Sequence, residues 1–254
     1  MNIFTKVKFF VLLFALFSTT AVLAQVTLTQ ATGGQNISVE KAVGGPQEQF
    51  TAIGDIVISD NAATNFSPGN DRRIMLNVPP GWQFETGTGT VTVSFSGTKI
   101  TGARVYDNTA TDFLIISYDV SNTAVAGNSI TISGIRVKST SKAVGTEAYI
   151  VRAQSPVNQG VISGFPNGTS VATLSKVAGP FASLQVLLPG QTNAPGTPSG
   201  RLGSTLISPT AGTNLAVTVN AVDYAFNVIT DAPNHQVSLA TNNPYATISA
   251  PVAL

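Results

Sequence analysis

The chain has no cysteine and only one histidine, His235, among its 254 residues. Without cysteine it has no disulfide bond, no thiol nucleophile and no Cys-ligated zinc or iron–sulfur site. A Ser-His-Asp triad would have to use His235, which follows Pro233 and Asn234 in an expected turn. The chain also has no G-x-S-x-G elbow, phosphate loop or dinucleotide-binding fingerprint. These absences predict a protein that is not an enzyme.

Charge is scarce as well, since only 10% of the residues are Asp, Glu, Lys or Arg. The only adjacent basic pair is Arg72-Arg73, so nothing indicates a nucleic acid or an anionic membrane as partner. Long helices are disfavoured too, because their exposed faces usually carry Glu and Lys. The 43% of hydrophobic residues is enough to build a core and argues against disorder.

Residues 1–24 have the pattern of a secretory signal peptide. Lys6 and Lys8 precede an apolar stretch at 9–17, and small residues stand before a cleavage site after Ala24. The apolar stretch is shorter than the roughly 20 residues that span a bilayer, so we expect no membrane span in the mature chain. Cleavage leaves 11 basic against 12 acidic residues, a net charge of −1. An exported protein without cysteine favours a bacterial source and a secreted or cell-surface location.

The mature chain is rich in short segments in which apolar residues alternate with polar ones, separated by Gly, Pro, Asn and Asp. This period of two predicts half-buried strands, and their close spacing predicts a β-sandwich over residues 25–178. Gly134 is expected to be a bulge between two such segments. The alternating apolar sets are Val26/Leu28, Ile53–Ile58, Ile74/Leu76/Val78, Val91/Val93/Phe95, Leu114/Ile116/Tyr118/Val120, Ile130/Ile132, Ile135/Val137 and Tyr149/Val151/Ala153.

A second domain is expected over residues 179–254, where the pattern restarts after a Gly-Pro pair. Alternation at Leu184, Val186 and Leu188 predicts its first strand, and residues 189–200 are too rich in turn formers to be a strand. Further strands are expected near 205–207, 215–222, 228–229, 236–240 and 246–249. In the clearest of these, Val217 and Val219 are expected to point inward, with Thr218 and Asn220 outward.

The stretch Leu215-Ala-Val-Thr-Val-Asn-Ala-Val-Asp-Tyr-Ala-Phe-Asn-Val-Ile229 resembles bacterial immunoglobulin-like repeats of large exported cell-surface proteins. Those repeats have an alternating strand, an Asp, a short turn that ends in Asn, and a Val that starts the next strand. Tyr224 and Phe226 depart from the pattern, where the family usually has small turn residues. The resemblance covers residues 180–254. It implies a sandwich of about seven strands, so we expect this domain to be truncated and to belong to a longer polypeptide.

Residues 25–178 resemble, more loosely, the sandwiches of cohesins and carbohydrate-binding modules. The aromatic residues Trp82, Tyr106 and Tyr118 are therefore candidates for a platform that stacks on sugar rings. The alternative for Trp82 is an ordinary core aromatic, because such side chains contribute a large buried area.

One loop is rich in oxygen ligands. Asp107, Asn108 and Asp112 offer two carboxylates and an amide, which suit a hard cation such as calcium. The loop lacks the spacing of an EF-hand, and the alternative is an Asx turn between two strands. No other cofactor is expected.

Two functions remain open at this point. The first is a structural or adhesive surface protein built from β-sandwich modules in series, with an extracellular protein or a polysaccharide as partner. The alternative is the carbohydrate-binding region of an exported multi-domain enzyme, for which an exposed row of aromatic residues would be the evidence.

Overall fold

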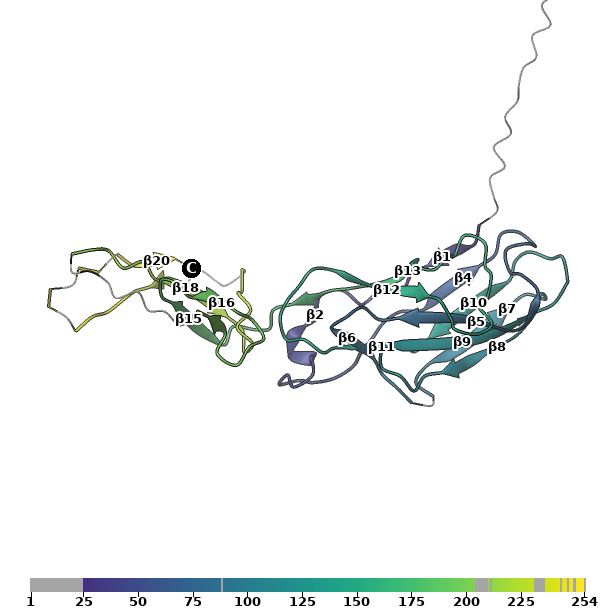
Figure 1. Ribbon diagram of the computed structural model, residues 1–254, viewed down its shortest axis with the longest axis horizontal. Helices are drawn as coiled ribbons and strands as arrows, with labels where there is room; N and C mark the ends of the chain where they lie inside the picture. Colours follow the sequence, from purple (N-terminus) through teal and green to yellow (C-terminus); the bar gives the residue numbers. More distant parts are fainter. Residues whose placement is uncertain are drawn as a thin grey trace, which may run out of the picture.

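The computed structural model describes residues 25–87, 89–203, 210, 212–230, 236–242, 244–245, 247–248 and 250–253 (Figure 1). Within these ranges the chain is all-β, and its only helical element is a short 3₁₀ turn, η1 (Val39–Lys41). The prediction of an all-β protein is therefore confirmed. No helix long and apolar enough to cross a membrane occurs in the same ranges. The predicted signal peptide, the predicted strand at 205–207 and His235 lie outside the described residues.

Three antiparallel sheets make up the larger part of the fold, drawn from purple to teal in Figure 1. Their strands come from distant parts of the chain, an arrangement consistent with a β-sandwich. The four-stranded sheet has the order β1 (Thr27–Thr29), β4 (Ile56–Ser59), β10 (Ser129–Ser133), β7 (Thr92–Ser96). The five-stranded sheet has the order β13 (Ser170–Leu174), β12 (Ala148–Ala153), β5 (Gly69–Asn77), β9 (Phe113–Val120), β8 (Ile100–Asp107). The three-stranded sheet has the order β3 (Thr51–Ala52), β11 (Arg136–Ser139), β6 (Trp82–Phe84).

A single hydrophobic core joins these sheets. Ile58 of β4 and Ile130 of β10 are paired across the ladder, and both are fully buried. They belong to the same cluster as Leu76 of β5 and Ile116 of β9. Each such side chain contributes about 1.5–3 kcal/mol by leaving water. For β4, β5 and β10 the alternation in the sequence predicted the buried face correctly, because one face of each strand is covered. In β9 both faces are buried from Leu114 to Tyr118.

Gly134 marks a change of sheet rather than a simple bulge. β10 ends at Ser133 in the four-stranded sheet, and β11 begins at Arg136 in the three-stranded one. Gly134 has a φ of +75°, and a Cβ atom there would lie 2.3 Å from the carbonyl oxygen of Thr90. Only glycine tolerates both conditions, so this residue allows one stretch of chain to serve two sheets.

In β12 the structure buries the face opposite to the one the alternation indicated. The sequence pattern selected Tyr149, Val151 and Ala153, but the buried residues are Ile150 and Arg152. The pattern failed because a charged residue occupies an inward position, which sequence reasoning assigns to solvent.

The smaller part of the fold, green to yellow in Figure 1, consists of two-stranded ladders. It follows a short parallel pair between β14 (Lys176–Val177) and β2 (Ile37–Ser38). Its ladders pair β15 (Ser183–Leu187) with β18 (Thr218–Val222), β16 (Thr192–Asn193) with β17 (Arg201–Leu202), and β19 (Gln236–Val237) with β20 (Val252–Ala253). The assignment of these ladders to a separate, truncated immunoglobulin-like domain remains a prediction.

The face predicted for β15 is also reversed. Leu184 and Val186, expected inside, are 47% and 45% exposed, whereas Gln185 and Leu187 are buried. In β18, Thr218 is exposed as expected, but Val219 is only half-buried. The ladder therefore leaves the apolar side chains of Leu184 and Val186 in contact with solvent.

Candidate functional sites

The three aromatic residues proposed as a sugar platform do not lie together on the surface. Trp82 is 7% exposed and Tyr118 is fully buried, and both belong to the hydrophobic core. Tyr118 packs edge-on against Phe66, with 6.0 Å between the ring centroids. Their rings have no face free for a sugar, so the assignment of these two residues is corrected. Core packing, the alternative named for Trp82, is what the structure shows.

Tyr106 alone is exposed, but one face of its ring is occupied. The guanidinium carbon of Arg73 lies 3.6 Å from the ring centroid, a close cation–π contact. A single ring covered in this way is no row of stacking aromatics. The evidence that would have favoured the carbohydrate-binding alternative from aromatic residues is therefore not found among the described residues.

The oxygen-rich loop is organised as an Asx turn. The Asp107 carboxylate accepts hydrogen bonds from the backbone N–H and the hydroxyl of Thr109, at 2.9 and 2.7 Å. The Asn108 amide is buried and donates to the Gly87 carbonyl oxygen and the Thr90 hydroxyl, away from Asp107. No group of three acidic or histidine ligands is found in the described ranges. Asp107 and the amide nitrogen of Asn108 thus have partners within the protein, whereas the buried amide oxygen of Asn108 has none. The assignment of Asp107, Asn108 and Asp112 to calcium remains a prediction.

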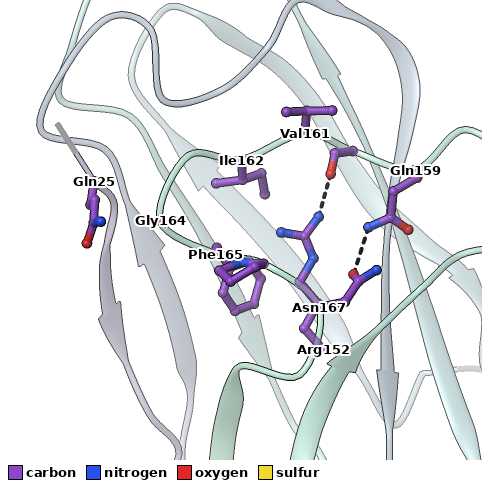
Figure 2. Close-up of a pocket in the computed structure, with 10 residues that line it drawn as sticks. Gln25, Arg152, Gln159, Val161, Ile162, Gly164, Phe165 and Asn167 are labelled. Atoms are coloured by element: carbon purple, nitrogen blue, oxygen red, sulfur yellow. Dashed lines mark hydrogen bonds between the residues drawn. The ribbon is translucent and has the colours of Figure 1, made fainter. Parts of the chain in front are cut away.

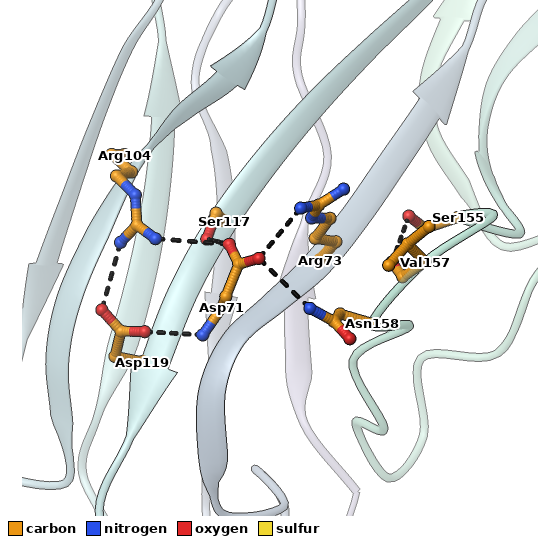
Figure 3. A network of polar contacts seen from close by, with 8 residues as sticks. All are labelled: Asp71, Arg73, Arg104, Ser117, Asp119, Ser155, Val157 and Asn158. Atoms are coloured by element: carbon orange, nitrogen blue, oxygen red, sulfur yellow. Dashed lines mark hydrogen bonds and ion pairs between the residues drawn. The ribbon is translucent and has the colours of Figure 1, made fainter.

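A polar network on the five-stranded sheet centres on Asp71, which sits at a bulge of β5 with a φ of +52° (Figure 3). Its carboxylate accepts from the Ser117 hydroxyl at 2.6 Å, from Arg73 at 2.9 Å and from Asn158 at 3.2 Å. Arg104 bridges Asp71 and Asp119, at 3.3 and 3.1 Å. Four stretches of the chain are thereby connected on one surface.

These bonds determine what Asp71 can do chemically. The Ser117 hydroxyl, followed by Arg73, lowers the pKa of Asp71 from its ordinary 3.8 to about 2, because each donor stabilises the charged form. A general acid needs a pKa near the working pH, so Asp71 is unsuited to donate a proton at neutral pH. Asp71 and Asp119 act as anchors for arginine side chains.

A pocket of about 690 Å³ opens beside β12 (Figure 2). Arg152 lines it and is only 3% exposed. Its guanidinium donates to the Gly160 carbonyl oxygen and lies 4.7 Å from the centroid of the Phe165 ring. Its Nε has no hydrogen-bond partner. The other lining residues are Gln25, Gln159, Gly160, Val161, Ile162, Gly164, Phe165, Pro166 and Asn167.

The charge on Arg152 has no carboxylate partner among the ion pairs of the described residues. Burial lowers its pKa, an effect partly offset by Tyr118. A buried, unpaired ion typically costs several kcal/mol. One carbonyl oxygen and an aromatic ring, which contributes about 0.5–2 kcal/mol, compensate this cost only in part. Sequence reasoning missed Arg152 because the alternation placed Tyr149, Val151 and Ala153 inside and Arg152 in solvent. No feature of the sequence marks its inward position.

A second buried polar site lies between the two parts of the fold and is built around Asp223. Its carboxylate accepts from the backbone N–H groups of Gly179 and Ala225, both at 2.8 Å, and of Asn227 at 2.9 Å. The Asn227 amide accepts from the Val144 N–H at 2.7 Å and donates to both oxygens of Asp223. Asp223 and Asn227 therefore fasten the turn to Gly179 and to Val144 in the larger part.

The two residues that depart from the repeat pattern have clear contacts at this junction. The Tyr224 hydroxyl donates to the Val39 carbonyl oxygen at 2.8 Å, which adds another bond to the larger part. Phe226 has a φ of +64°, and its ring occupies the space where a Cβ of Gly200 would lie. Larger residues at these positions thus add contacts that small turn residues do not provide.

Comparison of this chain with protein-family models, with curated proteins and with solved structures finds no match. The function is therefore inferred from the geometry described above.

Proposed function

We propose that this chain is an exported, non-catalytic protein with a structural or adhesive role at the bacterial cell surface, built from β-sandwich modules in series. The junction around Asp223 and Tyr224 is the observation that supports it most. Bonds from Gly179, Val144 and Val39 converge there on one turn. A fixed joint between consecutive parts suits a protein that holds a binding surface away from a cell, because a joint without such bonds is expected to move.

The test is location and attachment in the organism that carries the gene. Intact cells are treated with protease and probed with an antibody against the full chain, and attachment to protein-coated and polysaccharide-coated surfaces is compared with that of a deletion strain. The proposal expects protease-accessible protein and reduced attachment of the deletion strain. A protein that stays inside the cell, or deletion cells that attach normally to every surface, would contradict it.

A carbohydrate-binding region is the second candidate, and the Arg152 pocket favours it. Amide side chains of Gln159 and Asn167 line the same pocket as the buried Phe165. Ligand sites commonly combine an apolar lining with a few polar groups that fix orientation. Retention of the purified chain on immobilised polysaccharides tests this candidate, and failure to bind any of a panel of neutral and acidic polymers would contradict it.

A further inference from the structure

We propose that the pocket beside β12 binds the carboxylate of a uronic acid residue in an acidic polysaccharide, with the Arg152 guanidinium as its charged partner (Figure 2). This inference rests on the carbohydrate-binding candidate above, since it names the ligand class of that site. It does not require the protein to be an adhesin.

The positive charge at the base of the pocket is the first step. Arg152 is buried with an unpartnered Nε, and no ion pair of the described residues involves it. Arg72 also has a buried, unpartnered Nε, and both arginines act electrostatically on the buried Tyr118 hydroxyl. Only Arg152 of the two lines the pocket, and its positive charge is the one that an anion in the pocket would neutralise.

The shape of the charged group points to a carboxylate. A guanidinium is planar and presents parallel N–H donors that match the two oxygens of a carboxylate. Phosphate sites, in contrast, are commonly built from several backbone N–H groups at a helix N-terminus. Here the backbone group bonded to the guanidinium is the Gly160 carbonyl, which is an acceptor.

The rest of the lining suits a sugar. Gln159 and Asn167 are bonded to each other at 3.2 Å at the rim, and amide groups both donate to and accept from hydroxyls. Val161, which also lines the pocket, is 62% exposed, and Pro166 adds a second exposed apolar group. A pyranose ring has hydroxyls at its edge and C–H groups on its faces. The volume of about 690 Å³ lies within the usual range of roughly 300–1,000 Å³ for small-ligand sites.

Calorimetric titration of the purified full chain provides the test. The probes are methyl glucuronoside, its neutral counterpart methyl glucoside, a short peptide with a free C-terminal carboxylate, and inorganic sulfate. We expect the glucuronoside to bind about tenfold or more tightly than the glucoside, because a hydrogen bond to a charged group is lost in the neutral sugar. Equal binding of both sugars overturns the role of Arg152. Tighter binding of the peptide or of sulfate overturns the choice of an acidic sugar.

Matched variants locate the binding site. Val161→Glu puts a negative charge at the rim and should weaken glucuronoside binding about tenfold or more. Val157→Glu adds the same charge on the same loop at a residue that is 51% exposed and outside the pocket lining, and it should leave affinity unchanged. Arg152→Gln should abolish the preference for the acidic sugar, and circular dichroism checks its folding. An equal loss in the two valine variants refutes the site.

The outcomes separate this inference from the proposals it follows. A chain that binds neutral polysaccharides independently of Val161 and Arg152 is a carbohydrate-binding protein with a different site, so the inference fails alone. A chain that binds glucuronoside in the pocket but stays inside the cell supports the inference and contradicts the adhesive role.

Discussion

Asp223→Ala is the substitution that tests most directly how the junction is held together. Asp223 is 1% exposed, and its carboxylate accepts three backbone N–H groups, those of Gly179, Ala225 and Asn227. Alanine removes both oxygens and leaves three backbone donors, on the buried residues Gly179, Ala225 and Asn227, without partners. A buried donor left unsatisfied costs about 1–3 kcal/mol.

The expected loss is about 3–5 kcal/mol of unfolding free energy. The lower value follows if each donor costs the minimum. The upper value is smaller than three times the maximum cost of one unsatisfied donor, for two reasons. The space left by the carboxylate is polar and can admit a water molecule, and burying the charge of Asp223 itself carries a cost that alanine removes.

Urea denaturation followed by two local probes measures this effect. Trp82 is the only tryptophan and lies in the core of the larger part, so its fluorescence reports on that part. Hydrogen exchange of the β15 amides reports on the smaller part. We expect Asp223→Ala to lower protection in β15 by the full amount and to change the Trp82 transition much less.

Asp55→Ala is the matched control, because Asp55 is exposed and makes no ion pair among the described residues. A change within about 0.5 kcal/mol is expected for it. If Asp223→Ala costs less than about 1 kcal/mol, or no more than the control, the three hydrogen bonds do not hold the junction and the reasoning is refuted.

Three further predictions follow from buried or paired side chains. The pKa of Asp71 is lowered to about 2, chiefly by the Ser117 hydroxyl, so the ionised carboxylate stabilises the fold above pH 3.8 and this contribution is lost as the pH falls through about 2. The difference in unfolding free energy between wild type and Asp71→Asn should therefore shrink between pH 3.8 and about 2. A difference that does not change with pH would contradict this prediction. Trp82 is buried, so acrylamide should quench its fluorescence weakly and added sugars should leave the emission unchanged; strong quenching would show that the ring is accessible. In urea unfolding, Leu187→Ala should lower the unfolding free energy by about 2–4 kcal/mol, whereas Val186→Ala, at a residue that is 45% exposed, should lower it by less than about 1 kcal/mol. Equal losses would contradict the assignment of Leu187 to the buried face of β15.

The sheets of the larger part were predictable because their strands are covered on one face by apolar side chains. Ile130 and Ile132 alternate along β10 and are fully buried, whereas the residues on either side of them are only half-buried. Local sequence contains this information, since the period of a strand is two residues. Strand order does not follow from it: β5 lies between β12 and β9, and the pairing depends on contacts among distant segments.

The polar sites were less predictable, and for a physical reason. Asp71 meets Ser117 and Asn158 only because a bulge in β5 and the register of β9 bring them together. No sequence motif of fixed spacing predicts such a contact. Asp223 and Asn227 are an exception, because they are only four positions apart and their bonds lie within one turn. The resemblance that drew attention to this turn did not reveal its bonds to Val144 and Gly179.

The two strands whose buried face was predicted wrongly show how a structural polar residue differs from a ligand-binding one. In both, a polar residue occupies an inward position, Gln185 in β15 and Arg152 in β12. Gln185 donates to the Gly200 carbonyl oxygen at 2.6 Å and accepts from Asn220 at 3.2 Å, so both ends of its amide have partners within the fold. Arg152 has a charge without a counterion and a donor without an acceptor, beside an open pocket. An inward polar residue that departs from the expected pattern is most informative where the fold gives it no partner. For this reason Arg152, and not Gln185, is the residue for which we propose a partner from outside the chain.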